Sequence, residues 1–118
     1  LRERTQALRE RGITDDRICW DAGIGFGKTV EQNFALLARQ RDLLADGHPL
    51  LAGWSRKSSL GTVSGESLPR LVSSVAAALL AVERGARIVR VHDVRETVGA
   101  IKVWGAMQSA ALPRERTT

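Results

Sequence analysis

Three short polar clusters, each directly after a short apolar run, most constrain how this chain can fold. They are Asp21–Lys28 (DAGIGFGK), Ser55–Lys57 (SRK) and Arg90–Asp93 (RVHD). The apolar runs that precede them, such as Leu50–Trp54, are typical of short buried strands. Polar side chains at the carboxyl ends of successive parallel strands are how α/β folds build a functional site. The sequence therefore predicts a parallel α/β fold with a polar site at one end of its sheet.

Helical patterns separate the apolar runs, so the strands are expected to be parallel. We expect strands over 17–20, 50–54 and 87–91, helices over 1–11, 29–46, 71–84 and after Asp93, and a Ser/Gly-rich connection over 55–68. The order is α-(βα)-(βα)-(βα), with a repeat near 35 residues. Three strands do not close a barrel, which needs about eight strands and roughly 250 residues. The repeat fits a barrel segment and also an open doubly wound sheet.

The chain is basic, with 18 Lys and Arg against 13 Asp and Glu and a formal net charge of +5. It has three Trp, two Phe and no Tyr, so it lacks the aromatic platforms that accompany a nucleic-acid-binding surface. The excess charge is either a solvated surface or an anionic small-molecule site. The second reading rests on Arg56, Lys57, Arg90 and His92, which all fall at strand ends.

The single cysteine, Cys19, lies inside an apolar strand and is expected to be a buried structural thiol. One cysteine allows no disulfide within the chain, which suits the reducing cytoplasm. No apolar run approaches the roughly 20 residues that span a bilayer, and no signal peptide pattern is present. We therefore expect a cytoplasmic protein without membrane partners. The chain opens without a methionine inside a charged helical pattern, which indicates a segment of a longer sequence.

The glycine loop after the first strand has two readings of equal weight. Ala22–Thr29 matches a loosened phosphate-loop pattern in which Ala replaces the first Gly, and Thr29 with Gln32 forms a capping box for the following helix. The pattern Gly-x-Gly-x-x-Gly fails, because Gly27 follows Phe26 directly. In the other reading, the glycines supply the positive φ angles of a tight turn.

The other clusters point to an anion. Arg90 and His92 are two residues apart, so a strand would direct both to the same side. Two cations aimed together favour a phosphate site over a structural histidine. Asp21 accepts N–H groups of a ligand or pairs with a neighbouring cation, and Ser55–Lys57 either covers a ligand or forms an exposed basic turn. Zinc is not expected, because neither His48 nor His92 has a ligand-spaced Cys or His nearby.

Together and in this order, the three clusters resemble the carboxyl-terminal part of bacterial dihydropteroate synthase. The resemblance covers 9–107 and extends to Gly53-Trp54, Asn33, the Ala-rich helix 75–82 and Ile101–Trp104. It implies a (β/α)₈ TIM barrel of the pterin-binding type, of which this chain forms the last three βα units as an incomplete barrel. Residues 1–112 would belong to this domain, and 113–118 would form a tail.

Two positions depart from the family pattern. Ala22 stands where the family has Pro, and Trp20 stands where it usually has an aliphatic residue. Loss of the Pro loosens the turn by about 0.4–1 kcal/mol through the unfolded state. It removes no functional group.

The resemblance implies a transferase of folate synthesis that joins 6-hydroxymethyl-7,8-dihydropterin diphosphate to 4-aminobenzoate and releases diphosphate. Such a reaction needs the leaving diphosphate held and the pterin oriented, rather than a strong base. The implied catalytic residues are Lys57 and Asp21. The implied binding residues are Asp21, Gly53, Lys57 and Arg90 for the pterin, Arg90 and His92 for diphosphate, and Phe26 and Ser55 for aminobenzoate, where sulfonamides compete in this family.

The resemblance also implies Mg²⁺ as a cofactor, with its ligand residue expected outside this chain and none within it. It implies two small-molecule substrates as partners and a homodimer for the full-length protein, and we expect this chain alone to be inactive. Two alternatives stay open: a phosphate-loop nucleotide-binding protein using Gly23–Thr29, and a non-catalytic truncated barrel. The first would need a second acidic strand end for Mg²⁺, and Asp93 is the candidate.

Overall fold

The computed structural model describes residues 1–111. Three short strands form one sheet in the order β1-β2-β3, and both pairs are parallel. The strands are β1 (Trp20–Asp21), β2 (Leu50–Ala52) and β3 (Ile88–Val89). Trp20 pairs with Leu50, and Leu51 pairs with Ile88. The parallel arrangement predicted from the helical crossovers is therefore confirmed.

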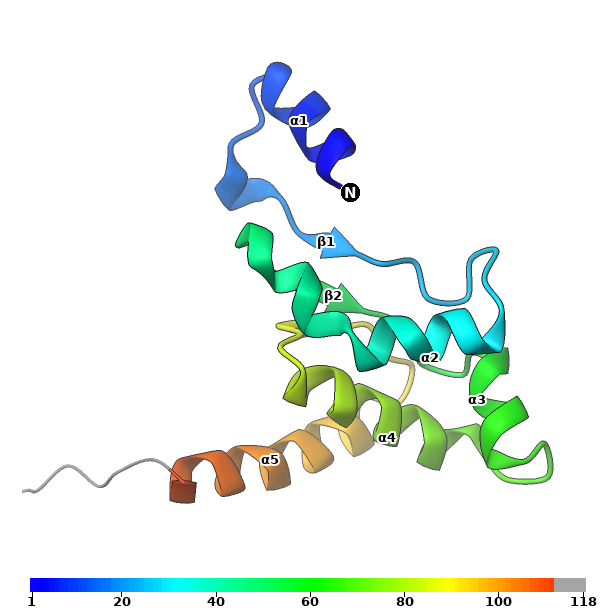
Figure 1. Ribbon diagram of the computed structural model, residues 1–118. Coiled ribbons are helices and arrows are strands. Elements are labelled where there is room, and N and C mark those ends of the chain that lie inside the picture. The colour runs from blue at the N-terminus through cyan, green and yellow to red at the C-terminus, as the bar shows by residue number, and fades with distance from the viewer. Residues whose placement is uncertain (112–118) are drawn as a thin grey trace, which may run out of the picture.

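One helix precedes the first strand, and the others follow the strands and pack beside one another (Figure 1). They are α1 (Arg2–Glu10), α2 (Val30–Ala38), α3 (Ser58–Ser64), α4 (Arg70–Glu83) and α5 (Val94–Ala111), with 3₁₀ turns η1 (Asp15–Arg17) and η2 (Gln40–Asp46). Helix α4 packs against α3, α5 and β3, while α1 stands apart at the β1 end of the sheet (Figure 1). The capping box predicted at the start of α2 is confirmed, because Thr29 and Gln32 exchange both hydrogen bonds.

Several predicted boundaries differ from the structure. All three strands are shorter than expected: β2 and β3 end before their polar clusters, whereas β1 starts late, after the 3₁₀ turn η1, and extends to Asp21. The predicted helix 29–46 stops being α-helical at Arg39, where buried Gln40 turns toward α4 and donates to the carbonyls of Ala81 and Arg84. The predicted connection 55–68 contains α3. The boundary predicted after residue 112 lies outside the described residues.

The two faces of the sheet have different surroundings. Leu50 and Ala52 of β2, and Trp54 just after it, alternate toward the helices and are almost completely buried, as the two-residue period of an extended chain requires. They join two apolar clusters, of which the larger contains Ile24, Leu37, Ala52, Trp54, Leu60, Ala77, Ala81 and Ala86, and the smaller Ile18, Trp20 and Leu50. Ile88, on the opposite face, is 46% exposed. The described helices thus cover one face.

Cys19 is exposed, so the prediction of a buried thiol was wrong. Its neighbours Ile18 and Trp20 are buried in the smaller apolar cluster. Alternation along the chain therefore turns Cys19 away from that cluster. An apolar strand sequence does not guarantee burial when helices cover a single face of the sheet.

Trp20 ties α1 to the sheet. Its indole Nε1 donates to Thr5 Oγ1 at 2.8 Å, and its ring stacks on buried His48 with the ring centroids 5.1 Å apart. His48 Nε2 lies 3.2 Å from Asp15 Oδ1, which also accepts from Arg9 Nε at 2.8 Å. The Arg9 hydrogen bond, followed by the one to His48, holds the pKa of Asp15 below its usual value. Trp20, which stands where the family usually has an aliphatic residue, thus adds a hydrogen bond that holds α1 to the sheet.

Candidate functional site

The three polar clusters converge on one cavity at the carboxyl ends of the strands. Its volume is about 700 Å³. It is lined by Asp21, Phe26, Gly53, Ser55, Arg56, Lys57, Arg90, Val91 and His92. All seven residues that the family resemblance assigns to the substrates line this cavity, together with Arg56, which its position at a strand end had also indicated, and Val91.

Asp21 is oriented by two hydrogen bonds. Its Oδ1 accepts from the Gly23 backbone N–H at 2.9 Å, and its Oδ2 accepts from Arg90 Nη1 at 3.3 Å. The side chains of the ion pair are 36% and 54% exposed, respectively. Screening by water keeps such a pair weak. A ligand can therefore break this ion pair at little cost in free energy, by offering N–H groups to Asp21 or an anion to Arg90.

Lys28 faces its own loop. Its ammonium donates to the Gly23 carbonyl at 2.9 Å and to the Phe26 carbonyl at 3.3 Å. A phosphate-loop lysine instead has to reach the phosphates of a nucleotide. Gly23, Gly25 and Gly27 all have positive φ. The geometry therefore favours the tight-turn reading of this loop over the phosphate-loop reading.

Lys57 crosses the glycine loop. Its Nζ lies 4.6 Å from the centroid of the Phe26 ring, within cation–π range. A Cβ at Gly25 would lie only 3.0 Å from Lys57 Cδ, so glycine leaves room for this crossing. Phe26 is 65% exposed. The Phe26 ring of the loop and the Lys57 ammonium thus lie side by side at the cavity.

Ser55 holds His92. The buried Ser55 Oγ accepts from the His92 backbone N–H at 3.1 Å and lies 2.9 Å from His92 Nδ1. Because Oγ already accepts the backbone N–H, its own proton is free to go to Nδ1. When Ser55 Oγ donates to Nδ1, the ring proton lies on Nε2. His92 then offers an N–H donor to an anion.

Arg90 and His92 are brought together differently from the prediction. Strand β3 ends at Val89, so strand alternation does not place them. Instead, the Arg90 backbone N–H donates to the Ala52 carbonyl at 2.9 Å, and Ser55 fixes His92. These contacts, rather than strand alternation, place Arg90 and His92 on the same cavity.

Arg56 shapes the second cluster and is a non-glycine residue with φ of 56°, a left-handed conformation that L residues rarely adopt. Its backbone N–H donates to Ser74 Oγ at 2.9 Å, and its Nη2 donates to Asp93 Oδ1 at 3.1 Å. These contacts hold a sharp turn that places both Ser55 and Lys57 on the cavity. Asp93 is thus the ion-pair partner of Arg56 on this turn.

Gly53 lies under Arg90. A Cβ at this position would overlap Arg90 Nη2 and would lie 3.0 Å from Cζ. The guanidinium therefore lies directly against the strand backbone, in a place that glycine leaves free. This close approach gives Gly53 a physical role at the site.

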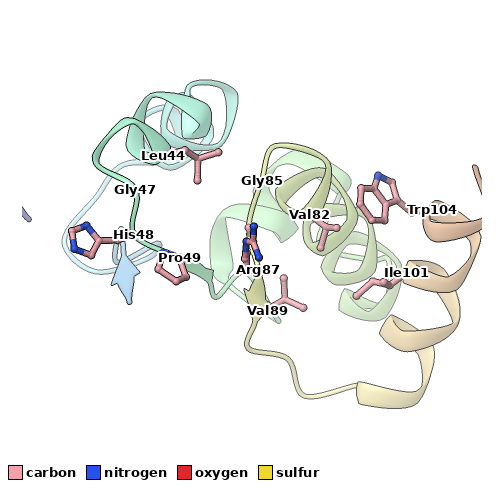
Figure 2. A pocket seen from close by; sticks show the side chains of 11 residues that line it. Leu44, Gly47, His48, Pro49, Val82, Gly85, Arg87, Val89, Ile101 and Trp104 are labelled. Carbon is pink, nitrogen blue, oxygen red and sulfur yellow. The ribbon is translucent and has the colours of Figure 1, made fainter. Parts of the chain in front are cut away.

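A second cavity, of about 730 Å³, lies at the amino-terminal end of β2 and β3 and holds none of the predicted site residues. In Figure 2, Ile101 and Trp104 of α5 line one side of it, and His48 lies on the far side. Within residues 1–111, no three His, Cys, Asp or Glu side chains are grouped to hold a metal ion. None of the described helices is both long and apolar enough to cross a membrane.

The fold and the site define a class of protein: a parallel α/β enzyme type with a basic, polar site at the carboxyl ends of its strands. A family model described as "Pterin binding enzyme" matches residues 1–92. The chain belongs to this family of pterin binding enzymes. The resemblance to dihydropteroate synthase is confirmed by relatives of that name.

The dihydropteroate synthase of Haemophilus influenzae is 43% identical over 111 residues, which cover 93% of this chain and 40% of that protein. The solved enzyme of Stenotrophomonas maltophilia is 49% identical with a TM-score of 0.89, over 95% of this chain and 42% of the other. The Xanthomonas albilineans enzyme in complex with 7,8-dihydropteroate has the same identity and TM-score, over 94% and 42%. The chain thus spans about two fifths of the length of these relatives, and the predicted fold class is confirmed as a part of their barrel.

Proposed function

We propose that this chain supplies the last three βα units of a dihydropteroate synthase. The observation that carries the proposal is the convergence of Asp21, Lys57, Arg90 and His92 on one cavity in a chain of the pterin binding enzyme family. Solved relatives in complex with 7,8-dihydropteroate and with 4-aminobenzoic acid support it. The substrates are then a pterin diphosphate and 4-aminobenzoate, and the reaction belongs to folate synthesis.

Arg90 and His92 bind the diphosphate. Arg90 contributes a guanidinium suited to bidentate hydrogen bonds with phosphate oxygens. His92 contributes its Nε2–H, because Ser55 occupies Nδ1. When the bond between the pterin methylene carbon and oxygen breaks, its electron pair leaves with the diphosphate. Donors already in place stabilise that growing charge.

Asp21, Gly53 and Lys57 act on the pterin side. The Asp21 carboxylate accepts the N–H groups of the pterin ring once the ligand replaces Arg90 on Oδ2, and so stabilises positive charge that develops on the pterin. Gly53 lets Arg90 lie flat beside that ring. Lys57 sits where the pterin and the incoming amine meet. The amine nitrogen forms the new C–N bond and then releases a proton to solvent.

Phe26 and Ser55 receive the aminobenzoate. The exposed Phe26 ring offers a stacking surface next to Lys57. Ser55 has one hydroxyl proton, which goes to His92 Nδ1 in the free site and to the aminobenzoate carboxylate when that substrate binds. Aminobenzoate binding would then be coupled to the diphosphate group through Ser55.

The described residues do not fit a magnesium site. Asp21 is bonded to Gly23 and Arg90, and Asp93 is bonded to Arg56. Mg²⁺ generally needs carboxylates together with substrate phosphates and water. We therefore propose that the Mg²⁺ ligand lies outside residues 1–111, as the family resemblance implies. We also propose a cytoplasmic location, which suits a chain with a single, exposed thiol.

The test compares this chain alone with a chimera in which it replaces the matching segment of the Haemophilus influenzae relative. We expect the chimera to form dihydropteroate and the chain alone to be inactive, because its three strands leave one sheet face open. Turnover by the isolated chain would contradict the expected inactivity. A folded chimera that binds neither substrate would overturn the proposed function and favour a non-catalytic barrel segment.

Substitution of Gly53 by Ala is expected to weaken binding of inorganic pyrophosphate to the chimera about tenfold, because the new methyl group displaces the Arg90 guanidinium and one charge-assisted hydrogen bond is lost. Titration calorimetry measures the change. Gly99→Ala is the control, since a Cβ at that position meets nothing within 4 Å. Equal affinities in the two variants would contradict the role given to Gly53.

We further propose that the complete protein is a homodimer, as the family resemblance implies. Large apolar side chains are exposed along α3, α4 and the turn between them, namely Val63, Leu68 and Val72. An apolar groove of about 290 Å³ runs among α2, α3 and α4. Val72→Asp is expected to convert a dimeric chimera to a monomer in light scattering, whereas Leu8→Asp on α1 is not. A monomeric unmodified chimera would contradict this proposal.

A further inference from the structure

Asn33 is a polar side chain inside the apolar face of α2. It is 1% exposed, and Phe34 and Leu37 of the same helix pack into the larger apolar cluster. Burial of an amide is costly unless its donor and its acceptor both find partners. The partners of Asn33 therefore decide what this residue contributes.

Those partners belong to two different site loops. Asn33 Oδ1 accepts from the Gly25 backbone N–H at 3.1 Å, and Asn33 Nδ2 donates to the buried Ser59 Oγ at 2.9 Å. Gly25 directly precedes Phe26, and Ser59 lies two residues after Lys57. One buried amide thus links the glycine loop to the start of α3.

The link lies behind the place where Phe26 and Lys57 meet. Lys57 Nζ is 4.6 Å from the Phe26 ring centroid. Within residues 1–111, no hydrogen bond runs directly from one of these loops to the other, so Asn33 supplies their polar connection. Arg90 and His92 are held by other contacts, to Asp21 and Ser55. Phe26 and Lys57 therefore have a direct support, through Asn33, that Arg90 and His92 do not share.

We propose that Asn33 is a positioning residue for the part of the site that binds aminobenzoate. By fixing Gly25 and Ser59 to one rigid amide, it sets the spacing between the Phe26 ring, which receives the aminobenzoate, and the Lys57 ammonium, which lies where the two substrates meet. Ser59 is its partner in this role. The inference rests on the proposed function for the identity of the ligand, while the link between the loops stands on the contacts alone.

The experiment compares Asn33→Leu, Ser59→Ala and the control Gln40→Met in the chimera. Gln40 is also a buried amide, and its Nε2 donates to the Ala81 and Arg84 carbonyls away from the site. We expect Asn33→Leu to raise the KM for aminobenzoate about tenfold, in line with the loss of buried hydrogen bonds. The KM for pterin diphosphate should change less than about twofold by the same scale. Gln40→Met should lower the melting temperature without changing either KM.

Ser59→Ala removes only the hydrogen bond from Asn33 Nδ2 to Ser59 Oγ. It provides a second test if Asn33→Leu does not fold. Its expected effect is a smaller rise in the same KM. An equal rise in both KM values, or no change in the KM for aminobenzoate in a folded variant, would show a merely structural role and overturn the proposal.

Hydrogen exchange separates this result from failure of the proposed function. Peptides covering 23–28 and 57–61 should both exchange faster in Asn33→Leu and stay unchanged in Gln40→Met. If the unmodified chimera binds no aminobenzoate, the proposed function fails, and this exchange pattern still decides whether Asn33 couples the two loops. Faster exchange of one segment alone would refute the coupling.

Discussion

Replacement of Arg90 by Ala in the chimera is expected to weaken binding of the pterin diphosphate tenfold to a hundredfold. A charge-assisted hydrogen bond to an anion contributes about 1.5–3 kcal/mol. Affinity of aminobenzoate for the preformed complex should change less, because Phe26 and Ser55 remain in place. Titration calorimetry with each substrate in turn measures both quantities.

Lys28→Ala is the matched comparison, because it removes a cation from the adjacent glycine loop that does not line the cavity. Lys28 Nζ is bonded to the carbonyls of Gly23 and Phe26, so its loss should loosen the glycine loop without removing a diphosphate contact. Under the phosphate-loop alternative, Lys28 would bind ATP or GTP. Nucleotide binding that disappears in Lys28→Ala, together with no pterin binding by the unmodified chimera, would overturn the synthase proposal.

Lys57→Ala is expected to lower the rate of a single turnover by on the order of a hundredfold, as loss of a preorganised charge at the reacting centre typically does. The ammonium lies at the junction of the two proposed substrates, beside Phe26. Arg90 and His92, the proposed ligands of the diphosphate, are unchanged in this variant. Binding of pterin diphosphate should therefore change much less than the rate.

Lys102→Ala is the control for charge alone, since Lys102 is exposed on α5. It should leave both the rate and the affinity unchanged. A Lys57→Ala variant that loses substrate affinity but keeps its rate of turnover would assign Lys57 to binding instead.

The position of the site could be predicted from the sequence, because strands that are joined by helices and end in polar clusters can pair in few ways. Helical crossovers require parallel strands, and parallel strands bring their carboxyl ends to one edge. Asp21, Lys57 and Arg90 are therefore neighbours although they are far apart in the chain. Local patterns were sufficient here, since no detail of side-chain packing was needed.

Other features depend on tertiary contacts that no local pattern reveals. Helix α3 has the sequence SSLGTVS, which combines weak helix formers with no apolar period. It forms where Asn33 bonds Ser59 and where Arg70 Nη1 donates to the Lys57 carbonyl at 3.0 Å. The exposure of Cys19 likewise follows from the open face of the sheet rather than from its own segment.

Asn33 did leave a signal in the sequence. Val30, Asn33, Phe34 and Leu37 occupy the spacing of a single helical face, and three of the four are apolar. A polar residue at a core position indicates a specific buried partner. The spacing alone does not say that the partners come from two different loops.

The sheet has consequences for how an enzyme of this kind can be divided. Strands β1 and β3 are its two edges, and an edge strand carries backbone groups ready to pair with another strand. A barrel cut just before these three units yields two pieces with mutually complementary edges. Co-expression of the two pieces is therefore a route to a split enzyme, in which growth without added folate would report that the halves have found each other.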